Sequence, residues 1–213
     1  MAKNTLPATS EHEEKLERLL AVAAEIFAEK GYHHASIREL SRRAGVSLSG
    51  LYYYFSSKEE LLFMIQERSL RRVLDGLKHK LKRSDEPAGR LRAMIGNHVG
   101  FFAQNMAAMK VLTHEFDSLE GKYKARIRDL RLEYSNLCTE LLRELRRSTG
   151  SDEVLPLNVA TSALFGMMNW IYTGYQPGSS IPVDRLSEHL FRLFTGGFSS
   201  SAEPAASLER RVG

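Results

Sequence analysis

The chain of 213 residues contains one cysteine, Cys138, and therefore lacks the set of cysteines that an intramolecular disulfide framework requires. No apolar run approaches the roughly 20 residues that a helix needs to span a bilayer. The first residues, MAKNTLPATSEHEE, also lack the apolar core of a signal peptide. These absences predict a soluble protein of the reducing cytoplasm that has no membrane partner.

Signatures of catalysis and of metal binding are missing as well. The seven histidines show no metal-ligand spacing, no glycine-rich phosphate loop is present, and no histidine lies close enough in sequence to Cys138 to activate its thiol. We interpret Cys138 as a buried structural residue beside Leu137 and Leu141. The expectation is a protein that is not an enzyme and needs no metal and no cofactor, with a helical enzyme as a distant alternative.

Strand signatures are nearly absent, because few stretches alternate β-branched and polar residues. Apolar residues instead recur three and four positions apart, as they do on one face of a helix. We predict an all-α fold of about nine helices. They fall near residues 10–30, 36–44, 47–54, a long stretch from 57 that Pro87 and Gly89 interrupt, 90–105, 106–118, 122–147, 156–175 and 183–197.

Serine and glycine residues mark the predicted ends of the first helices. Ser36 and Ser57 each precede a glutamate by three positions, the spacing of a capping box at a helix start. Gly31 and Gly45 are expected to end the helices before them, because glycine tolerates the left-handed conformation of a helix end. Further breaks are expected at Gly121, Gly150 and 176–180.

Two short predicted helices separated by a turn at Gly45 have the arrangement of a helix-turn-helix, whose second helix enters the major groove of DNA. At about 100° per residue, Leu51 and Phe55 share one side of the second helix and should pack inward. Ser49 and Tyr53 then point outward, where hydroxyl groups and rings suit contacts to bases and phosphates. Three consecutive tyrosines at 52–54 cannot all face inward.

Basic residues gather in the same stretch. From Lys30 to Lys58 five lysines and arginines accompany a single acid, Glu39, and this excess equals the formal net charge of +4 of the whole chain. Such a cluster is either a solvated face or the electrostatic footprint of a nucleic-acid partner. The helix-turn-helix spacing favours DNA.

Four short motifs lie in and around this segment: GY at 31–32, SIREL at 36–40, AGVS at 44–47 and LYYYFSSKEEL at 51–61. Together they resemble the N-terminal signature of the TetR family of transcriptional regulators. The resemblance implies a homodimer that binds double-stranded DNA at a palindromic operator, usually as a repressor, and that a small effector releases. A nucleoid protein without an effector is disfavoured by the large aromatic second half.

The resemblance also implies which residues meet DNA. Ser36 and Lys58 occupy positions that touch phosphates, and Arg38 occupies one that reaches a base or the backbone. Leu48 stands where relatives often have a polar residue or a lysine, so contact with a thymine methyl is expected in place of a hydrogen bond. The recognition helix is expected to supply Ser47, Leu48, Ser49, Gly50, Tyr52, Tyr53 and Tyr54.

The second half is rich in large, flexible apolar side chains, which form a plain core in most helical domains and line the ligand pocket in sensor proteins. The polar residues Asn169, Tyr134 and His114 are candidates to orient an effector among them. The predicted effector-binding residues are Phe101, Phe102, Met106, Met109, Leu112, Phe116, Tyr134, Phe165, Met168, Asn169, Trp170 and Tyr172.

Two further motifs bear on the effector class. THEF at 113–116 and NWIY at 169–172 are similar to the branch of the family that responds to acyl-coenzyme A thioesters and controls fatty-acid or related degradation. A drug-like hydrophobic effector of an efflux repressor is the alternative. Basic residues that could meet coenzyme phosphates, or that belong to a solvated helix, are Lys110, Lys122, Lys124, Arg126 and Arg131.

The last two predicted helices carry small and apolar residues on more than one face, so each needs a second partner surface. The resemblance implies that they form a four-helix bundle in the homodimer. The expected segments are a flexible N-terminal arm at 1–10, a DNA-binding head at 11–58, an effector-binding and dimerisation domain at 59–198 and a flexible tail at 199–213.

Overall fold

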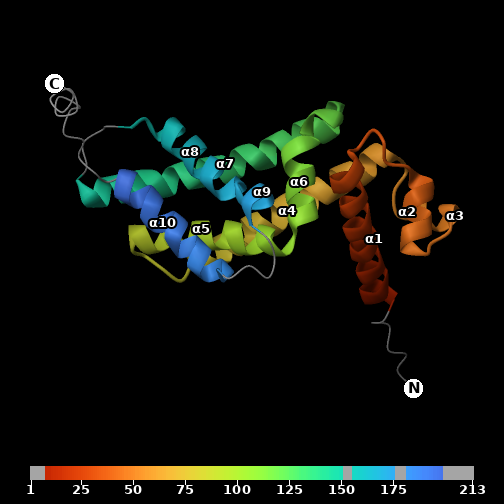
Figure 1. The fold of residues 1–213 in the computed structure, drawn as a ribbon, viewed down its shortest axis with the longest axis horizontal. Helices are drawn as coiled ribbons and strands as arrows, with labels where there is room; N and C mark the ends of the chain where they lie inside the picture. Colours follow the sequence, from red (N-terminus) through yellow and green to blue (C-terminus); the bar gives the residue numbers. More distant parts are fainter. Residues whose placement is uncertain (1–7, 151–154, 176–180, 199–213) are drawn as a thin grey trace, which may run out of the picture. The chain divides into compact units, whose positions relative to one another are not determined.

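The computed structural model describes residues 8–150, 155–175 and 181–198. Within those ranges every regular element is a helix, which confirms the predicted all-α fold (Figure 1). The predicted tail, most of the predicted N-terminal arm and the loop at 176–180 lie outside the described residues. The helices are α1 (Ala8–Lys30), α2 (Ile37–Ala44), α3 (Leu48–Leu51), α4 (Lys58–Leu81), α5 (Pro87–Gln104), α6 (Met106–His114), the 3-10 helix η1 (Phe116–Ser118), α7 (Gly121–Thr149), α8 (Leu157–Asn169), α9 (Ile171–Gly174) and α10 (Val183–Phe198).

The described helices divide into two compact units. The first unit comprises residues 8–72 and 105–131, and the second comprises 73–104 together with the described residues from 132 onward. The division falls inside α4 and α7, so each of these long helices contributes residues to both units. The boundary expected after residue 58 lies inside the first unit.

In the first unit, α1 packs against α6 and α2, and α2 packs against α3 (Figure 1). One face of α1 forms an apolar stripe that is buried, with Leu16, Leu20, Ala23 and Phe27 in the core. Gly31 follows the last residue of α1 with φ of 79°, in the left-handed region, and donates its N–H to the oxygen of Phe27 at 2.9 Å. The first helix therefore ends where predicted.

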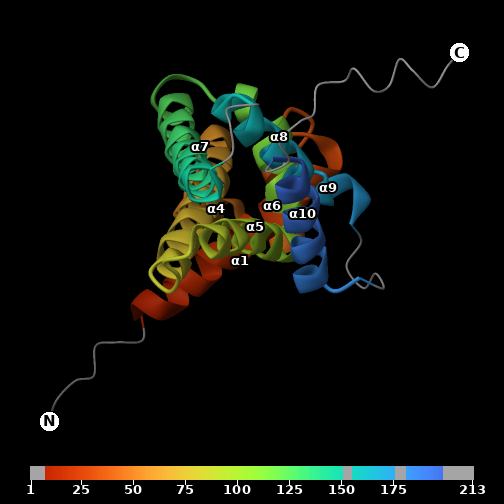
Figure 2. The same cartoon turned by 90° about the vertical axis from the view of Figure 1, so that its left-hand side faces the viewer.

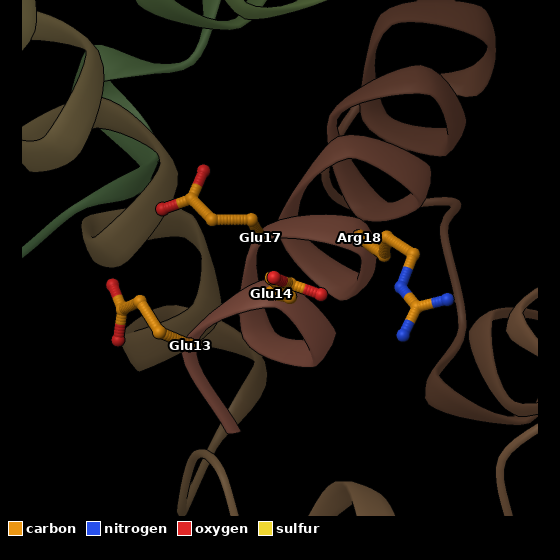
Figure 3. Close-up of a pocket in the computed structure, with 4 residues that line it drawn as sticks. All are labelled: Glu13, Glu14, Glu17 and Arg18. Carbon is orange, nitrogen blue, oxygen red and sulfur yellow. The ribbon is translucent and has the colours of Figure 1, made fainter. Parts of the chain in front are cut away.

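The N-terminal part of α1 is acidic. Glu13, Glu14, Glu17 and Arg18 line a hollow on its surface (Figure 3). Glu13 and Glu17 both accept hydrogen bonds from Arg68 of α4, and the bond from Arg68 lowers the pKa of Glu13. Two of the carboxylates at this hollow thus fasten α1 to the part of α4 that belongs to the first unit, which is a structural role.

In the second unit, α5 packs against α8, α9 and α10, and α10 also packs against α8. The views in Figures 1 and 2 both show α5 and α10 side by side. Leu91, Met94 and Ile95 are among the buried side chains of α5. The buried Asn97 donates from Nδ2 to the main-chain oxygen of Val73 at 2.8 Å, which joins α5 to the second half of α4.

Several helix boundaries differ from the prediction, among them those at Pro87 and Trp170. Pro87 is the first residue of α5 rather than a break before a helix near residue 90, because the fixed φ of proline and its missing N–H suit the first turn of a helix. The helix predicted at 156–175 is divided at Trp170 into α8 and α9. There the ring of Trp170 folds back onto Gly174, where an added Cβ would lie 1.8 Å from a ring carbon.

Candidate functional site

The turn between α2 and α3 is built from serine and glycine residues. Ser36 caps α2, because its Oγ accepts a hydrogen bond from Glu39 N at 3.2 Å. Gly45, with φ of 64°, ends α2 in the left-handed region. Ser47 caps α3 by accepting a hydrogen bond from Gly50 N at 3.1 Å. These local bonds fix where α3 starts relative to α2 and produce a helix-turn-helix.

The segment that begins with α3 has the two faces that the sequence predicted. Leu51 is fully buried and Phe55 is 3% exposed, whereas Tyr53 is 74% exposed and Ser49 is exposed. The inward and outward assignments are therefore confirmed. Tyr52 is also exposed, so the tyrosines do not all face inward, as expected.

The helix α3 itself is shorter than predicted and ends at Leu51. Residues 52–54 lie in hydrogen-bonded turns, in which Tyr54 N donates to the oxygen of Leu51 at 2.9 Å. A glycine within the helix and three aromatic residues after it both disfavour a longer helix. Gly50 nevertheless suits its position, because a Cβ there would lie 3.0 Å from Val46 Cγ1 in the turn.

Acidic partners neutralise part of the basic cluster. Lys30 pairs with Glu39 at 2.6 Å, and Arg43 pairs with Glu29 of α1 at 2.7 Å. The excess of positive charge counted along residues 30–58 therefore overstates the charge that is available to a partner, since Glu29 lies outside that stretch.

Arg38 and Arg42 are the arginines of α2 that keep their charge available. They lie one turn apart, both are exposed, and within the described residues neither side chain has a hydrogen bond or ion pair. Arg42 was not among the predicted DNA contacts. Its position four residues after Arg38, on the same side of the helix, is a signal that could have identified it.

Lys58 lies in the first turn of α4 and is engaged inside the first unit. Its Nζ donates to the main-chain oxygens of Tyr32, Ala35 and His33 at 2.9, 3.0 and 3.3 Å, and lies 4.4 Å from the centroid of the Tyr32 ring. These bonds use all three N–H groups of the ammonium. The geometry therefore does not support the predicted phosphate contact of Lys58, whose side chain instead ties α4 to the loop between α1 and α2.

A second candidate site lies in the second unit, where rings surround the buried His98 of α5. The Tyr134 hydroxyl lies 3.1 Å from His98 Nδ1, and Asn169 Oδ1 lies 3.1 Å from His98 Nε2. Because an amide oxygen only accepts, the imidazole carries its proton on Nε2 and accepts the hydroxyl proton of Tyr134 at Nδ1. The rings of Phe102 and Phe165 lie 4.7 and 5.8 Å from the imidazole, centroid to centroid.

Burial controls protonation in this unit. It lowers the pKa of His98 to about 4, so the imidazole is uncharged at neutral pH. It also raises the pKa of the buried Tyr134 hydroxyl, and it raises the pKa of the Cys138 thiol to about 12. Cys138 is therefore the buried, unreactive thiol that the sequence predicted.

The sequence pattern did not reveal His98, because a lone histidine on an apolar helix shows no ligand spacing. Its position four residues before Phe102 and three after Ile95 placed it on the buried face of α5, and this was the available signal. Of the three polar candidates, Tyr134 and Asn169 meet at this histidine, whereas His114 is exposed in the last turn of α6.

The predicted effector-binding residues divide between the two units. Phe101 contacts Phe102 at 5.0 Å between ring centroids, and Phe102 contacts His98, which joins both phenylalanines to the cluster. Trp170 is 51% exposed. The second unit contains Phe101, Phe102, Tyr134, Phe165, Met168, Asn169, Trp170 and Tyr172, and the first unit contains Met106, Met109, Leu112 and Phe116.

Several basic residues that were candidates for coenzyme phosphates have protein partners. Lys124 pairs with Asp117 at 2.9 Å, and Arg126 pairs with a glutamate of α4 at 3.2 Å. Arg131 donates to a main-chain oxygen in α6 and lies 4.3 Å from the centroid of the Phe116 ring. Lys124 and Arg131 support the packing of η1 and α6, and Arg126 ties α7 to α4, so a phosphate would compete with existing contacts.

Exposed apolar side chains lie on α8 and α10. Val159 is 46% exposed and Leu193 is 70% exposed.

Among residues 8–150, 155–175 and 181–198 no helix is both long and apolar enough to cross a membrane, and no group of acidic, histidine or cysteine side chains suits a metal ion.

The fold and the head together define a helix-turn-helix protein with a helical second unit. Residues 19–65 match the family model described as bacterial regulatory proteins of the tetR family, and residues 84–198 match the tetracyclin repressor-like C-terminal domain. The second match alone covers more than half of the chain. The protein belongs to the TetR family of transcriptional regulators.

Three similar proteins are informative. The chain is 25% identical over 157 residues to the fatty acid metabolism regulator protein of Bacillus subtilis, covering 73% of this chain and 80% of that protein. It is 32% identical over 109 residues to the transcriptional activator FasR of Mycolicibacterium smegmatis, covering 51% of this chain and 48% of that protein. The crystal structure of AibR in complex with isovaleryl coenzyme A and operator DNA has a TM-score of 0.74 at 20% identity, covering 84% of this chain and 97% of that one, which is a likeness of fold.

Proposed function

We propose that this protein reads a palindromic operator as a homodimer and leaves it when a small hydrophobic effector binds. The observation that supports DNA reading most directly is the exposed face of Ser49 and Tyr53, behind which Leu51 and Phe55 anchor the segment in the core of the head. A hydroxyl group and a phenol ring on such a face suit base edges, thymine methyls and phosphates.

In this proposal α2 supplies the contacts to the DNA backbone. The exposed Ser36 lies at its N-terminus, where free main-chain N–H groups and the helix dipole favour a phosphate. Arg38 and Arg42 add two charges that have no partner within the described residues. The proposed DNA-contacting set is Ser36, Arg38, Arg42, Ser47, Leu48, Ser49, Gly50, Tyr52, Tyr53 and Tyr54.

The dimer would form through α8 and α10. Val159 and Leu193 expose apolar surface there, and α8 also exposes the small residues Ala163 and Gly166, which allow a close approach of a second helix. A two-fold dimer would present two heads, matching the two halves of a palindrome.

The effector would bind in the second unit, near the rings around His98. An acyl thioester is the class that we favour, because an apolar chain suits the phenylalanine rings and a carbonyl oxygen suits the amide N–H donors of Asn169, whose Oδ1 accepts from His98. The relative from Bacillus subtilis, whose name refers to fatty acid metabolism, and the AibR fold, which holds isovaleryl coenzyme A, are consistent with this class.

The response would reach DNA through α4. The helix has residues 73–81 in the second unit, and its first residue, Lys58, holds three carbonyl groups of the loop at 32–35. Glu115 holds the same loop by accepting a hydrogen bond from Tyr32 N at 3.0 Å. A shift of α4 would therefore move the loop that leads into α2, and with it the separation of the two heads.

Anisotropy of a labelled operator, selected from random duplexes by the purified protein, tests this function. Saturating acyl-coenzyme A of the preferred chain length should weaken operator affinity about tenfold, which needs about 1.4 kcal/mol of differential binding. Coenzyme A alone and the free fatty acids serve as ligand controls. Release by drug-like hydrophobic compounds and by no thioester would instead favour an efflux regulator.

A matched pair of variants locates the effector. Phe165→Trp adds bulk to the cluster around His98 and should shift the preferred acyl chain toward shorter lengths. Phe63→Trp makes the same change in the first unit, where Phe63 stacks on Tyr123 at 4.5 Å, and should leave the preference unchanged. Equal shifts from both variants would place the effector outside this cluster.

Whether the protein represses or activates its promoter is a separate question. FasR, a relative over about half of its length, is an activator. A promoter fusion carrying the selected operator distinguishes the two: deletion of the gene should raise expression from a repressed promoter and lower it from an activated one.

A further inference from the structure

His12, in the first half of α1, touches the tyrosines that follow α3. Its ring stacks on Tyr54 with centroids 4.8 Å apart and planes at 29°, and it meets Tyr53 edge-to-face at 5.6 Å and 77°. The rings of Tyr53 and Tyr54 meet edge-to-face at 5.3 Å and 89°. His12, Tyr53 and Tyr54 thus form an aromatic trio that joins two segments far apart in sequence.

The ring of Tyr53 needs such support because its own surroundings hold it weakly. It is 74% exposed, so little of its surface is packed in the core. It also lies beyond the end of α3, in turns rather than in a regular helix. Its direction therefore depends on the neighbouring rings, of which Tyr54 is half-buried and stacked on His12.

We propose that His12 is a positioning residue for DNA reading: by stacking on Tyr54 it holds the Tyr53 ring in the direction that meets the groove. This inference rests on the proposed DNA-reading function of the head. It assigns a role in sequence discrimination to α1, outside residues 31–61 where the recognised motifs lie. A ring held before binding loses less rotational freedom on the operator than a free one.

The proposal attributes the effect to the aromatic ring of His12 and not to its charge. Glu13 lies beside it on α1, and the ring contacts the rings of Tyr53 and Tyr54. A phenylalanine at this position keeps the stacking and removes any charge, whereas a leucine has similar bulk and no ring. His12→Phe and His12→Leu therefore separate ring stacking from charge and from volume.

The experiment measures the affinity of full-length protein for the operator and for a scrambled duplex of the same length. An aromatic pair contributes enough that His12→Leu should weaken operator binding about three- to tenfold while changing the affinity for the scrambled duplex less than about twofold. His12→Phe should bind the operator within about twofold of the unchanged protein. His34→Leu, at an exposed histidine of the same unit, is the matched control and should have no effect.

Thermal unfolding establishes that each variant is folded, and His12→Gln supplies a polar, non-aromatic replacement should His12→Leu not fold. The inference is overturned if the non-aromatic variant reads the operator like the unchanged protein, if it loses operator and scrambled duplex equally, or if His12→Phe is no better than His12→Leu. An unchanged protein that prefers no duplex would instead contradict the proposed function itself.

Discussion

Tyrosine occurs in opposite environments in the two units. In the head, Tyr53 is 74% exposed and its hydroxyl has no hydrogen-bond partner within the described residues. In the second unit, Tyr134 is 4% exposed and its hydroxyl donates to His98. A buried hydroxyl must be satisfied inside the protein, whereas an exposed one is free to bond a partner. The same side chain thus stabilises one unit and offers a recognition surface in the other.

The largest expected effect comes from the core side of the reading segment. Leu51→Ala removes a fully buried side chain and should lower the free energy of unfolding of the head by about 2–5 kcal/mol. Leu48→Ala, at a 40% exposed leucine three residues earlier, is the control and should cost less than about 0.5 kcal/mol. Chemical denaturation followed by circular dichroism measures both. Equal losses would contradict the two-faced arrangement.

Acid should act on the second unit through His98. Its pKa is about 4 in the folded protein and about 6.5 when unfolded, so the unfolded chain binds the proton more readily. The uncharged imidazole of His98 therefore contributes to the free energy of unfolding. This contribution is fully present above pH 6.5 and is lost as the pH falls toward 4. Relative to pH 7, this loss should be about 2 kcal/mol at pH 5 and about 3 kcal/mol at pH 4.

His98→Phe provides the comparison for this pH dependence, because a phenylalanine ring does not titrate. The difference in unfolding free energy between pH 7 and pH 5 should shrink by about 2 kcal/mol in the variant. If the difference between pH 7 and pH 5 were identical in both proteins, the pKa of His98 would be the same in the folded and unfolded states.

Removing a tyrosine hydroxyl should lower the stability of the protein only where that hydroxyl has a hydrogen-bond partner inside the protein. Tyr134→Phe leaves His98 Nδ1 without its donor and should cost about 1–2 kcal/mol of stability. Tyr53→Phe removes a hydroxyl from an exposed ring and should leave stability unchanged. Thermal unfolding of the two variants measures both changes in stability. A greater loss of stability from Tyr53→Phe than from Tyr134→Phe would contradict the difference between the two units.

The smallest effects concern charge. Arg42→Ala should reduce the slope of operator affinity against salt by about 0.9 for each head, the amount of one phosphate contact. Lys58→Ala should lower stability through the loop at 32–35 and leave that slope unchanged, since its ammonium is held by carbonyl groups. A reduced slope for Lys58→Ala would restore the phosphate role that its position in the family implied.

The sequence predicted the features that depend on nearby residues. The caps at Ser36 and Ser57, the left-handed ends at Gly31 and Gly45, and the inward direction of Leu51 each follow from local spacing. The helix-turn-helix could therefore be derived from the residues alone, and its motifs led to the family.

The features that the sequence did not predict depend on residues far apart along the chain. The carbonyl groups held by Lys58 lie more than 20 residues away, and the partner of Arg43 lies on another helix. The network of His98 combines side chains from α5, α7 and α8. No periodicity within a single helix indicates contacts between residues so far apart in sequence. The sequence alone therefore could not show which basic side chains of the head lack acidic or carbonyl partners, or that His98 lies at the centre of the aromatic cluster.

The most direct test is the operator preference of Tyr53→Ala, measured as the ratio of affinities for the selected operator and a scrambled duplex. The ratio should fall by about tenfold, the worth of about one base contact, while binding to the scrambled duplex stays the same. A ratio equal to that of the unchanged protein would show that the exposed face of this segment does not read DNA.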